Sequence, residues 1–426
     1  MLKYQLTVSI DGKNNLKLVS LYVLYIFSGI LIYFFGPMEY ADHNKLLTFF
    51  YILNCYLLLF FGFFIGSKSF HLNISKKEGR HASPSKELKL FLFSSVITIF
   101  FNSYVVYDLY QNILNSGLDK FGAGAIYYLN LNSEKETGII TTLMTLFSPL
   151  SFISINIGVK LYRSLKFNHK LLLYFVVISS LLSYLLKGTN FGIFIVVINI
   201  LISSYIYSSG IKIPRFKSLL IALLLPMFVS LFLYNLGSRL NIDYIPSTIS
   251  GVEINREHFI FTILPLQLSL PASVAGSYIS QGYYAVSLMF NYNFDSTLGF
   301  GSGYFLLGKF SNILGDDFFK YTYQYKMDEL WAYRTQWHTA FVWLSNDFGY
   351  YSVFILCFIF GVLSSVVYKD AKRNKGIVST TLFAVISIIL VFIPANNILM
   401  SNPFIFMTFY SLLIIWIGRT KVYIKC

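Results

Sequence analysis

The chain has 426 residues, of which 56% are hydrophobic, 19% are aromatic and only 12% are charged. One soluble core cannot hide this much apolar surface, so the composition excludes an ordinary soluble globular protein and indicates a membrane protein. A net charge of +14 would suggest a nucleic-acid partner in a soluble protein, but here the distribution of the charge between loops explains it, and we expect no nucleic acid to bind.

Apolar segments long enough to cross about 30 Å of hydrocarbon recur along the whole chain. Because backbone groups in lipid must form their hydrogen bonds within the segment, each is expected to be a helix, and the predicted fold is all-α. We predict about ten spanning helices in a single integral membrane domain, residues 1–426. They lie near 18–36, 46–66, 90–110, 138–159, 171–186, 191–208, 218–235, 349–368, 378–395 and 404–418.

The charges divide unequally when the tails and loops are placed alternately on the two sides of a membrane. The side with both termini also has the loops 67–89, 160–170, 209–217 and 369–377. It holds 23 of the 33 Lys and Arg residues but only 4 of the 19 Asp and Glu residues. The positive-inside rule therefore places both termini in the cytoplasm.

A loop of about 100 residues, 236–346, separates the seventh and eighth predicted helices and faces outward. Loops of this length are usually functional. It contains "HFIFTILPLQLSLPASVAG", interrupted by Pro265 and Pro271, and "YYAVSLMFNYNF", which is too short to span. We expect re-entrant or interfacial helices here, and a pair of broken spans, giving twelve helices in all, is the alternative.

Three arginines lie in or beside this loop. Arg239 follows the seventh predicted helix, Arg256 stands in "INREHF", and Arg334 lies near the end of the loop. They could converge on a diphosphate, which planar guanidinium groups bind through paired hydrogen bonds. The alternative for each is simple attraction to lipid headgroups.

Several titratable groups could act as a base. His338, Glu253 or Asp347 could take a proton from an attacking sugar hydroxyl, and His258 lies beside Arg256 as a further candidate for substrate binding. The alternative for His338 is a solvated histidine at the membrane interface.

Common cofactor and metal motifs are missing from the sequence. It has no Walker A motif, no GxGxxG after a strand, no HExxH and no Cys/His cluster with metal-ligand spacing, so we predict no metal and no cofactor. The three cysteines, Cys55, Cys357 and Cys426, suggest neither a disulfide nor a metal site. Charged residues are nearly absent from the spans, which argues against an ion-coupled transporter.

The stretch "HTAFVWLSNDFGYY" resembles a motif shared by bacterial O-antigen ligases and Wzy-type O-antigen or capsule repeat-unit polymerases. His338 begins the motif, Asp347 takes the acid position and Gly349 the glycine position, while Ser352 stands where a second glycine often follows. "DFGYYSVFI" is similar to the polymerase version in particular. The loops "FGAGAIYYLNL" and "SYISQGYYAVSLMFNYNFDSTLGFGSGYF" also resemble those of the polymerases.

This chain differs from the family in one further feature. Between its fifth and sixth helices the family has a turn containing an arginine, and this chain has "LLKGTNFG" instead. Lys187 would substitute for that arginine as a point charge only.

The resemblance implies a metal-independent glycosyltransferase with a GT-C-like fold. It would act in the bacterial inner membrane, with its active site facing the periplasm or exterior. The growing glycan on undecaprenyl diphosphate would be transferred to the terminal sugar of a new lipid-linked repeat unit, and the lipid diphosphate released. The implied partners are undecaprenyl-diphosphate-linked oligosaccharides, the lipid bilayer and a chain-length regulator protein.

Two other functions stay open, and a structural or assembly role in the membrane is a further alternative. An O-antigen ligase shares the His motif but uses the lipid A core as its acceptor. A repeat-unit flippase is a transporter of similar size, although it would have short loops throughout.

The motif itself is expected to lie just outside the membrane. From Gly349 onward the chain enters the eighth helix. Helical spacing would place His338, Val342 and Ser345 on one face, with Phe341 and Trp343 approaching lipid.

Overall fold

The structure of the protein is a computed structural model. It describes residues 8–41, 44–74, 84–115, 139–187, 191–208, 244–249, 251–292, 294, 296–303, 306–307, 316–332 and 336–424.

The described residues are mostly helical. The helices are α1 (Val8–Phe35), α2 (Lys45–Ser69), α3 (Pro84–Asn115), α5 (Ile139–Leu161), α6 (Phe167–Leu185), α7 (Phe191–Tyr207), α9 (Phe259–Ile263), α10 (Leu266–Met289), η1 (Asp316–Tyr321), α12 (Tyr323–Met327), α13 (Ala340–Phe348), α14 (Ser352–Asn374), α15 (Ile377–Phe392), α16 (Ile398–Ser401) and α17 (Pro403–Arg419). The strands are β1 (Met38–Glu39), β2 (Phe70–Ile74), β3 (Thr248–Ile249), β4 (Val252–Ile254) and β5 (Thr420–Ile424).

Nine of the ten predicted spanning segments lie on helices of the described chain: α1, α2, α3, α5, α6, α7, α14, α15 and α17. The tenth, 218–235, falls outside the described residues. Within the described part, α2, α3, α5, α6 and α14 are long and apolar enough to cross a membrane, and shorter apolar helices lie in α1, α7, α15 and α17. Large apolar side chains such as Leu24, Phe100 and Ile355 are exposed on the outside of the bundle. These features define a helical membrane protein.

Glycine residues bring α2 and α14 into close contact. A Cβ atom at Gly62 would lie 2.1 Å from the carbonyl oxygen of Phe358, and one at Gly361 would lie 2.1 Å from that of Leu59. Gly62 and Gly66 have the GxxxG spacing that lets helix backbones approach each other in membranes. Because α14 follows α13 directly, this contact also fixes α13 relative to α2.

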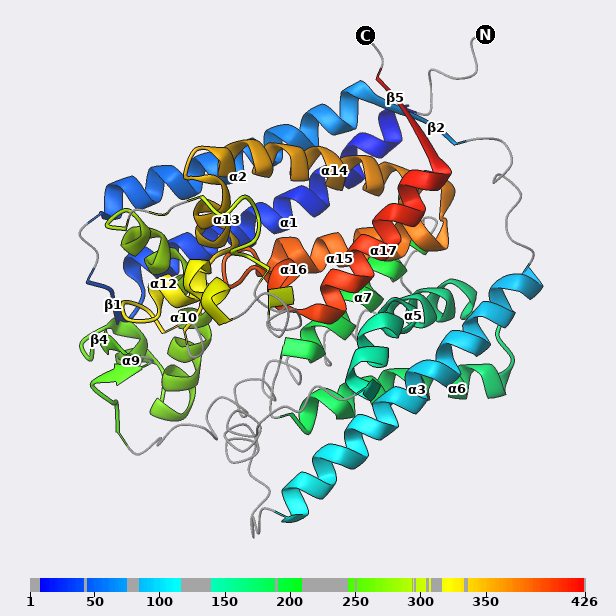
Figure 1. The fold of residues 1–426 in the computed structure, drawn as a ribbon, viewed down its shortest axis with the longest axis horizontal. Helices are drawn as coiled ribbons and strands as arrows, with labels where there is room; N and C mark the ends of the chain where they lie inside the picture. The colour runs from blue at the N-terminus through cyan, green and yellow to red at the C-terminus, as the bar shows by residue number, and fades with distance from the viewer. Residues whose placement is uncertain are drawn as a thin grey trace.

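Two small sheets lie at opposite ends of the bundle (Figure 1). β2, which follows α2, pairs antiparallel with β5, which follows α17. β1, which follows α1, pairs with β4 of the 236–346 loop, and β3 pairs with the other edge of β4. We call these the β2–β5 end and the loop end. The short strands add to the predicted all-α fold without changing its architecture.

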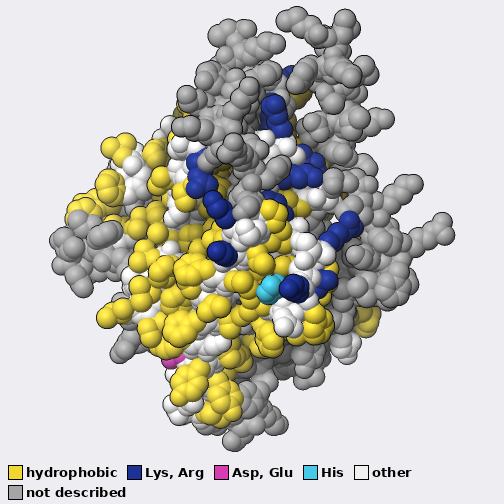
Figure 2. All heavy atoms as spheres, turned by 90° about the vertical axis from the view of Figure 1, so that its right-hand side faces the viewer, with side chains coloured by type: hydrophobic (Ala, Val, Ile, Leu, Met, Phe, Trp, Pro, Cys, Tyr) yellow, Lys and Arg dark blue, Asp and Glu magenta, His cyan; other side chains and the backbone are white. Residues whose placement is uncertain are grey.

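Basic side chains gather toward the β2–β5 end, as the face in Figure 2 shows, whereas acidic side chains are scarce on that face. The last turns of α2, α5, α14 and α17 contain Lys68, Lys160, Lys372, Arg373 and Arg419. The asymmetry of charge seen in the sequence is therefore present in the folded helices.

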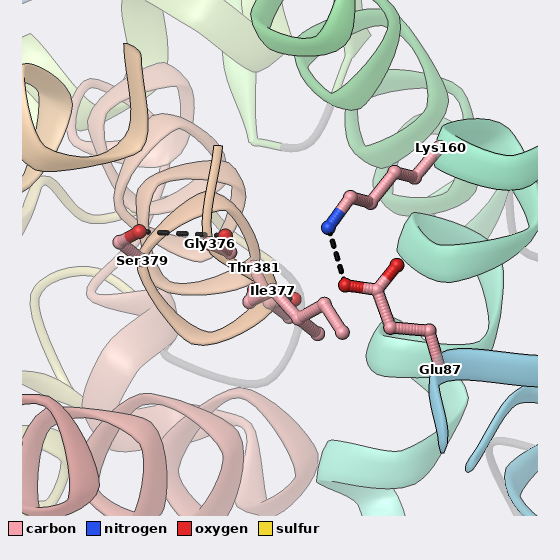
Figure 3. Close-up of polar contacts among 6 residues, drawn as sticks. All are labelled: Glu87, Lys160, Gly376, Ile377, Ser379 and Thr381. Atoms are coloured by element: carbon pink, nitrogen blue, oxygen red, sulfur yellow. Dashed lines mark hydrogen bonds and ion pairs between the residues drawn. The ribbon is translucent and has the colours of Figure 1, made fainter. Parts of the chain in front are cut away.

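Two buried carboxylates near this end, Glu87 and Asp370, have partners. Lys160 reaches from α5 to Glu87 of α3, with Nζ 2.6 Å from Oε1, beside the start of α15 (Figure 3). The Asp370 carboxylate of α14 accepts hydrogen bonds from Trp416 Nε1 at 2.7 Å and from Asn374 Nδ2 at 2.6 Å. Each group lies just beyond a predicted span, which agrees with the scarcity of charge inside the spans.

The described part of the 236–346 loop folds into several short elements and one long helix, α10, of 24 residues. It crosses α1 and α2 near the loop end (Figure 1), because Gly276 packs on Ile32 and the Phe290 ring lies 5.5 Å from the Tyr51 ring. Pro265 caps this helix, as its position as a helix breaker predicts, but Pro271 lies inside it. The prediction that Pro271 divides the apolar stretch was therefore wrong. Pro271 is the sixth residue of α10, so the helix continues through it although one interior backbone hydrogen bond is lost.

The position predicted for the motif stretch was also wrong. Phe341 and Trp343 do not face lipid: they are 2% and 5% exposed and belong to the same core as α2 and α10. His338 precedes α13, whose N-cap is Thr339, so it shares no helical face with Val342. The hydrophobic residues of this short helix turn inward because α10, α12 and α2 surround it.

Candidate functional site

His338 is held by the turn that follows α15. Its backbone N–H donates to the carbonyl oxygen of Ala395 at 3.0 Å, and that of Ala340 donates to Ile393 at 3.0 Å. Thr339 then caps α13 by accepting a hydrogen bond from Phe341 N at 3.1 Å. A two-residue backbone pairing and a helix cap together fix the direction of the imidazole ring.

The two ring nitrogens of His338 have different surroundings. Nδ1 is hydrogen-bonded to the hydroxyl of Tyr323 on α12, whereas Nε2 is buried and has no hydrogen-bond partner among the described residues. Burial lowers the pKa of His338 to about 3 from its ordinary value of 6.5, and the Ala332 backbone counteracts only part of this shift. The imidazole is therefore neutral, and Nε2 keeps an unused hydrogen-bonding position within the buried site.

Other buried polar atoms on α12 and α13 also lack partners in the described structure. The rings of Tyr323 and Trp343 lie 5.9 Å apart, and Trp343 Nε1 has no acceptor in the described structure. Gln324, the next residue on α12, is 1% exposed, and neither its amide nitrogen nor its oxygen has a described partner. Unpaired buried polar groups cost folding free energy and are uncommon in folded proteins. We call His338, Tyr323, Gln324 and Trp343 the His338 site.

The His338 site is recessed within the bundle. The Phe341 ring lies 5.2 Å from the ring of Tyr56, which is 11 residues from the loop end of α2. The Tyr25 hydroxyl donates to the Val391 carbonyl, and Tyr25 is 10 residues from the loop end of α1. At 1.5 Å per residue, both contacts place the start of α13 roughly 15 Å inside the ends of these helices.

Asp347, the acid of the motif, is fully engaged in holding a loop. Its Oδ1 accepts hydrogen bonds from the Thr297 hydroxyl at 2.5 Å and from Ser302 N at 3.0 Å, and its carbonyl oxygen accepts from Ser296 and Leu298. A Cβ atom at Gly301 would lie 2.6 Å from Oδ1, so the loop passes close to the carboxylate. These contacts assign Asp347 a structural role in the described chain, and its predicted contact with substrate stays a prediction.

A cation, Lys326, lies beside Asn346, the neighbour of Asp347, at the C-terminal end of α13. The Lys326 ammonium group donates to Asn346 Oδ1 at 3.0 Å and lies 6.0 Å from the centroid of the Phe294 ring. Lys326 is three residues after Tyr323 on α12, so the same short helix carries both the partner of His338 and a positive charge.

Three predicted residues lie together on the outer part of the loop. Arg256 is exposed, and so is Glu253, whose Cα pairs across the sheet with that of Glu39. His258 caps α9: Nδ1 accepts from Ile260 N and Nε2 donates to the Phe35 carbonyl. Both nitrogens of His258 are thus engaged in structure. Within the described residues, no hydrogen bond or ion pair joins these three residues to the His338 site.

The other three predicted residues are Arg239, Arg334 and Lys187. Arg239 and Arg334 lie outside the described residues. Lys187 follows α6 and its ammonium group lies 5.6 Å from the centroid of the Tyr184 ring. The start of α7 approaches the turn after α15, because the Phe191 and Phe392 rings are 4.9 Å apart.

Sequence reasoning missed Tyr323, Gln324, Trp343 and Lys326. The stretch "YTYQYKMDEL" offers a signal for the first two and the lysine, since it places polar and aromatic residues shortly before the motif histidine. Trp343 offered none, because an apolar ring within an apolar helix predicts packing.

Comparisons with protein-family models, with curated proteins and with solved structures found no match to this chain. The function must therefore be argued from the residues and their arrangement.

Proposed function

We propose that the protein is a glycosyltransferase that polymerises lipid-linked oligosaccharide repeat units for O-antigen or capsule. It would transfer the growing glycan from undecaprenyl diphosphate to the terminal sugar of a new lipid-linked repeat unit. The observation that carries this proposal is His338: a neutral imidazole with an unpartnered Nε2, recessed in an apolar helix bundle beneath a large loop. The motif around it, which resembles that of the polymerases, supports the same conclusion.

The proposed reaction uses this nitrogen as a base. A hydroxyl oxygen of the acceptor sugar attacks the anomeric carbon of the donor glycan and forms the new glycosidic bond. The bond between that carbon and the diphosphate oxygen breaks, and the lipid diphosphate leaves with the electron pair. The hydroxyl proton passes to Nε2 of His338.

Tyr323 selects the tautomer that this step requires. Nε2 has a free lone pair only when Nδ1 carries the proton and donates it to the Tyr323 hydroxyl oxygen. Burial raises the pKa of Tyr323 well above its ordinary value of 10.0, so this hydroxyl stays neutral and does not act as a competing base. A negatively charged substrate beside His338 would raise the pKa of the imidazole toward the range in which a base is effective.

Charge on the diphosphate must be balanced by cations. Lys326 is the cation that the described structure places beside α13. In the proposal, Arg239 and Arg334 also bind the diphosphate and balance its charge. Arg256 and Lys187 are further candidates for this role. A diphosphate is a good leaving group, so charge stabilisation, positioning and one base would suffice.

The proposed location follows from the charge asymmetry. Placing the basic β2–β5 end in the cytoplasm makes the loop end face the periplasm or exterior of a bacterial inner membrane. A site recessed from that side can receive sugars from the aqueous face while the lipid chains of both substrates stay at the depth of the membrane. A chain-length regulator is the expected protein partner.

Deletion of the gene in its host tests the proposal. A polymerase mutant should retain single repeat units on its surface glycan. Complete loss of the glycan would instead indicate the flippase, and free long chains would indicate the O-antigen ligase.

The arginine clamp has its own test. Arg239→Ala and Arg334→Ala should each abolish long chains while the protein still inserts in the membrane. Normal chain lengths in both variants would remove the arginine clamp from the mechanism.

A further inference from the structure

An apolar cavity of about 290 Å³ lies within the helix bundle, apart from the residues of the His338 site. Its walls come from five helices, α1, α2, α7, α14 and α15. Its innermost residues include Leu59 and Phe383, which are buried in the hydrophobic core. None of the side chains that line it is charged.

The few polar groups in the wall are already hydrogen-bonded. The hydroxyls of Tyr22 and Tyr25 donate to the carbonyls of Leu390 and Val391 at 2.7 and 2.8 Å. Ser387 donates to the carbonyl of Phe383 in its own helix. Water needs two or more polar partners to occupy a buried cavity, so this wall favours a hydrocarbon ligand over water.

The cavity opens toward lipid between α1 and α7. Leu21 of α1 and Leu201 of α7 both line it, and they are 66% and 58% exposed on the outside of the bundle. An exposed leucine on each side of the opening is what a passage for a lipid chain requires, because no polar group has to be desolvated as the chain enters.

The far end of the cavity leads to the candidate site. Leu390 and Val391, at the end of α15, line it, and the turn that immediately follows accepts hydrogen bonds from the backbone of His338 and Ala340. One short segment of chain therefore separates a hydrocarbon-sized space from the imidazole proposed as the base.

We propose that this cavity binds the isoprenoid chain of the lipid carrier, which enters between α1 and α7 and places its diphosphate toward His338. This inference rests on the proposed function. The site selects the substrate by its chain as well as by its sugars, and a lipid with a polar tail would bind poorly.

The test uses the full-length protein in nanodiscs and an undecaprenyl phosphate analogue with a photoreactive diazirine on its isoprenoid chain. We expect labelled peptides from the Leu21 region of α1 and the Leu201 region of α7. Leu21→Trp fills the mouth of the cavity, and labelling should fall roughly tenfold. Leu24→Trp is the matched control, because Leu24 is 64% exposed on the same helix but does not line the cavity.

Leu201→Trp and its control Leu182→Trp, at an exposed position on α6, repeat the comparison from the opposite side. Unlabelled undecaprenyl phosphate should compete with the probe, whereas phosphatidylglycerol should not. Equal labelling of mouth and control variants, or full displacement by phosphatidylglycerol, would overturn the inference. Labelling that meets these expectations in a protein that makes no polymer would support the cavity assignment and remove the proposed function alone.

Discussion

The two ends of α13 carry the two ionisable residues of one motif, and they use their polar atoms in opposite ways. At the C-terminal end, the Asp347 carboxylate accepts hydrogen bonds from the Thr297 hydroxyl and the Ser302 backbone N–H. At the N-terminal end, His338 is equally buried but leaves Nε2 without a partner in the described structure. A group whose hydrogen bonds are all made stabilises the fold, whereas a buried group with one unmade bond destabilises it. The difference gives Asp347 a structural role and supports the proposal that His338 acts on the substrate.

The largest effect should follow from removing the imidazole. His338→Gln should lower glycan transfer by a factor of about 10² to 10⁴, the usual contribution of a general base, without preventing insertion in the membrane. The measurement is transfer between lipid-linked repeat units in proteoliposomes, with Asp347→Asn as the matched substitution at the other end of α13. A modest loss in His338→Gln would move the role of the base to Glu253 or another acid.

Truncating the acid should instead affect stability. Asp347→Ala leaves the Ser302 backbone N–H and the Thr297 hydroxyl without an acceptor, and we expect the free energy of unfolding to fall by about 3 kcal/mol. Thermal unfolding in detergent measures it, with Asp328→Ala as the control, because Asp328 is an exposed acid at the end of α12. If Asp347→Ala keeps its stability but loses transfer activity, the contrast between the two ends of α13 is wrong.

The lowered pKa of His338 predicts how the stability of the protein depends on pH. The unfolded chain takes up a proton as the pH falls through about 6.5, but the folded protein resists it until about pH 3. Stability is therefore full above pH 6.5 and falls with decreasing pH, by about 2 kcal/mol between pH 6.5 and pH 5. Wild type should lose this much more than His338→Gln when unfolding is measured at both pH values. Identical pH dependence in the two proteins would show that His338 is not shielded as described.

The smallest effect should come from the tyrosine hydroxyl. Tyr323→Phe keeps the ring beside His338 and Trp343 but removes the group that orients Nδ1, so transfer should fall roughly tenfold in kcat with little change in KM. Tyr325→Phe on the same helix is the control, because Tyr325 is 57% exposed. Equal rates in Tyr323→Phe and wild type would mean that the tautomer is set elsewhere.

Hydrophobicity and charge were sufficient to predict the main helices, because a spanning segment must satisfy its own backbone and its length is set by the bilayer. Hydrophobicity and charge did not predict whether the apolar residues of α13 face lipid or the protein core. These residues suit lipid or protein equally well, and only the tertiary contacts of Phe341 with Tyr56 decide between them. The continuation of α10 through Pro271 was missed because an interior proline usually ends or kinks a helix, whereas here the packing of α10 on α1 and α2 holds the helix together.

The candidate site was predictable only in part. The motif identified His338 and Asp347, but spacing along a chain does not show which polar atoms are already hydrogen-bonded. His258 illustrates the limit: it lies beside Arg256 in the sequence, yet its ring is a helix cap. The polar and aromatic stretch around Tyr323 is a signal in the sequence, but only the structure shows that the Tyr323 hydroxyl is hydrogen-bonded to Nδ1 of His338.

The hydrogen bonds of the first two helices have a consequence for biosynthesis. Tyr22 and Tyr25 of α1, and Tyr51 and Tyr56 of α2, bond to groups that lie between 227 and 368 residues later in the chain. When α1 and α2 first enter the bilayer, these hydroxyls therefore lack the partners that they have in the finished protein. Ribosome-bound chains that stop before α10 should expose them to lipid or to the insertion machinery. The earliest helices to be made would then be among the last to reach their final packing.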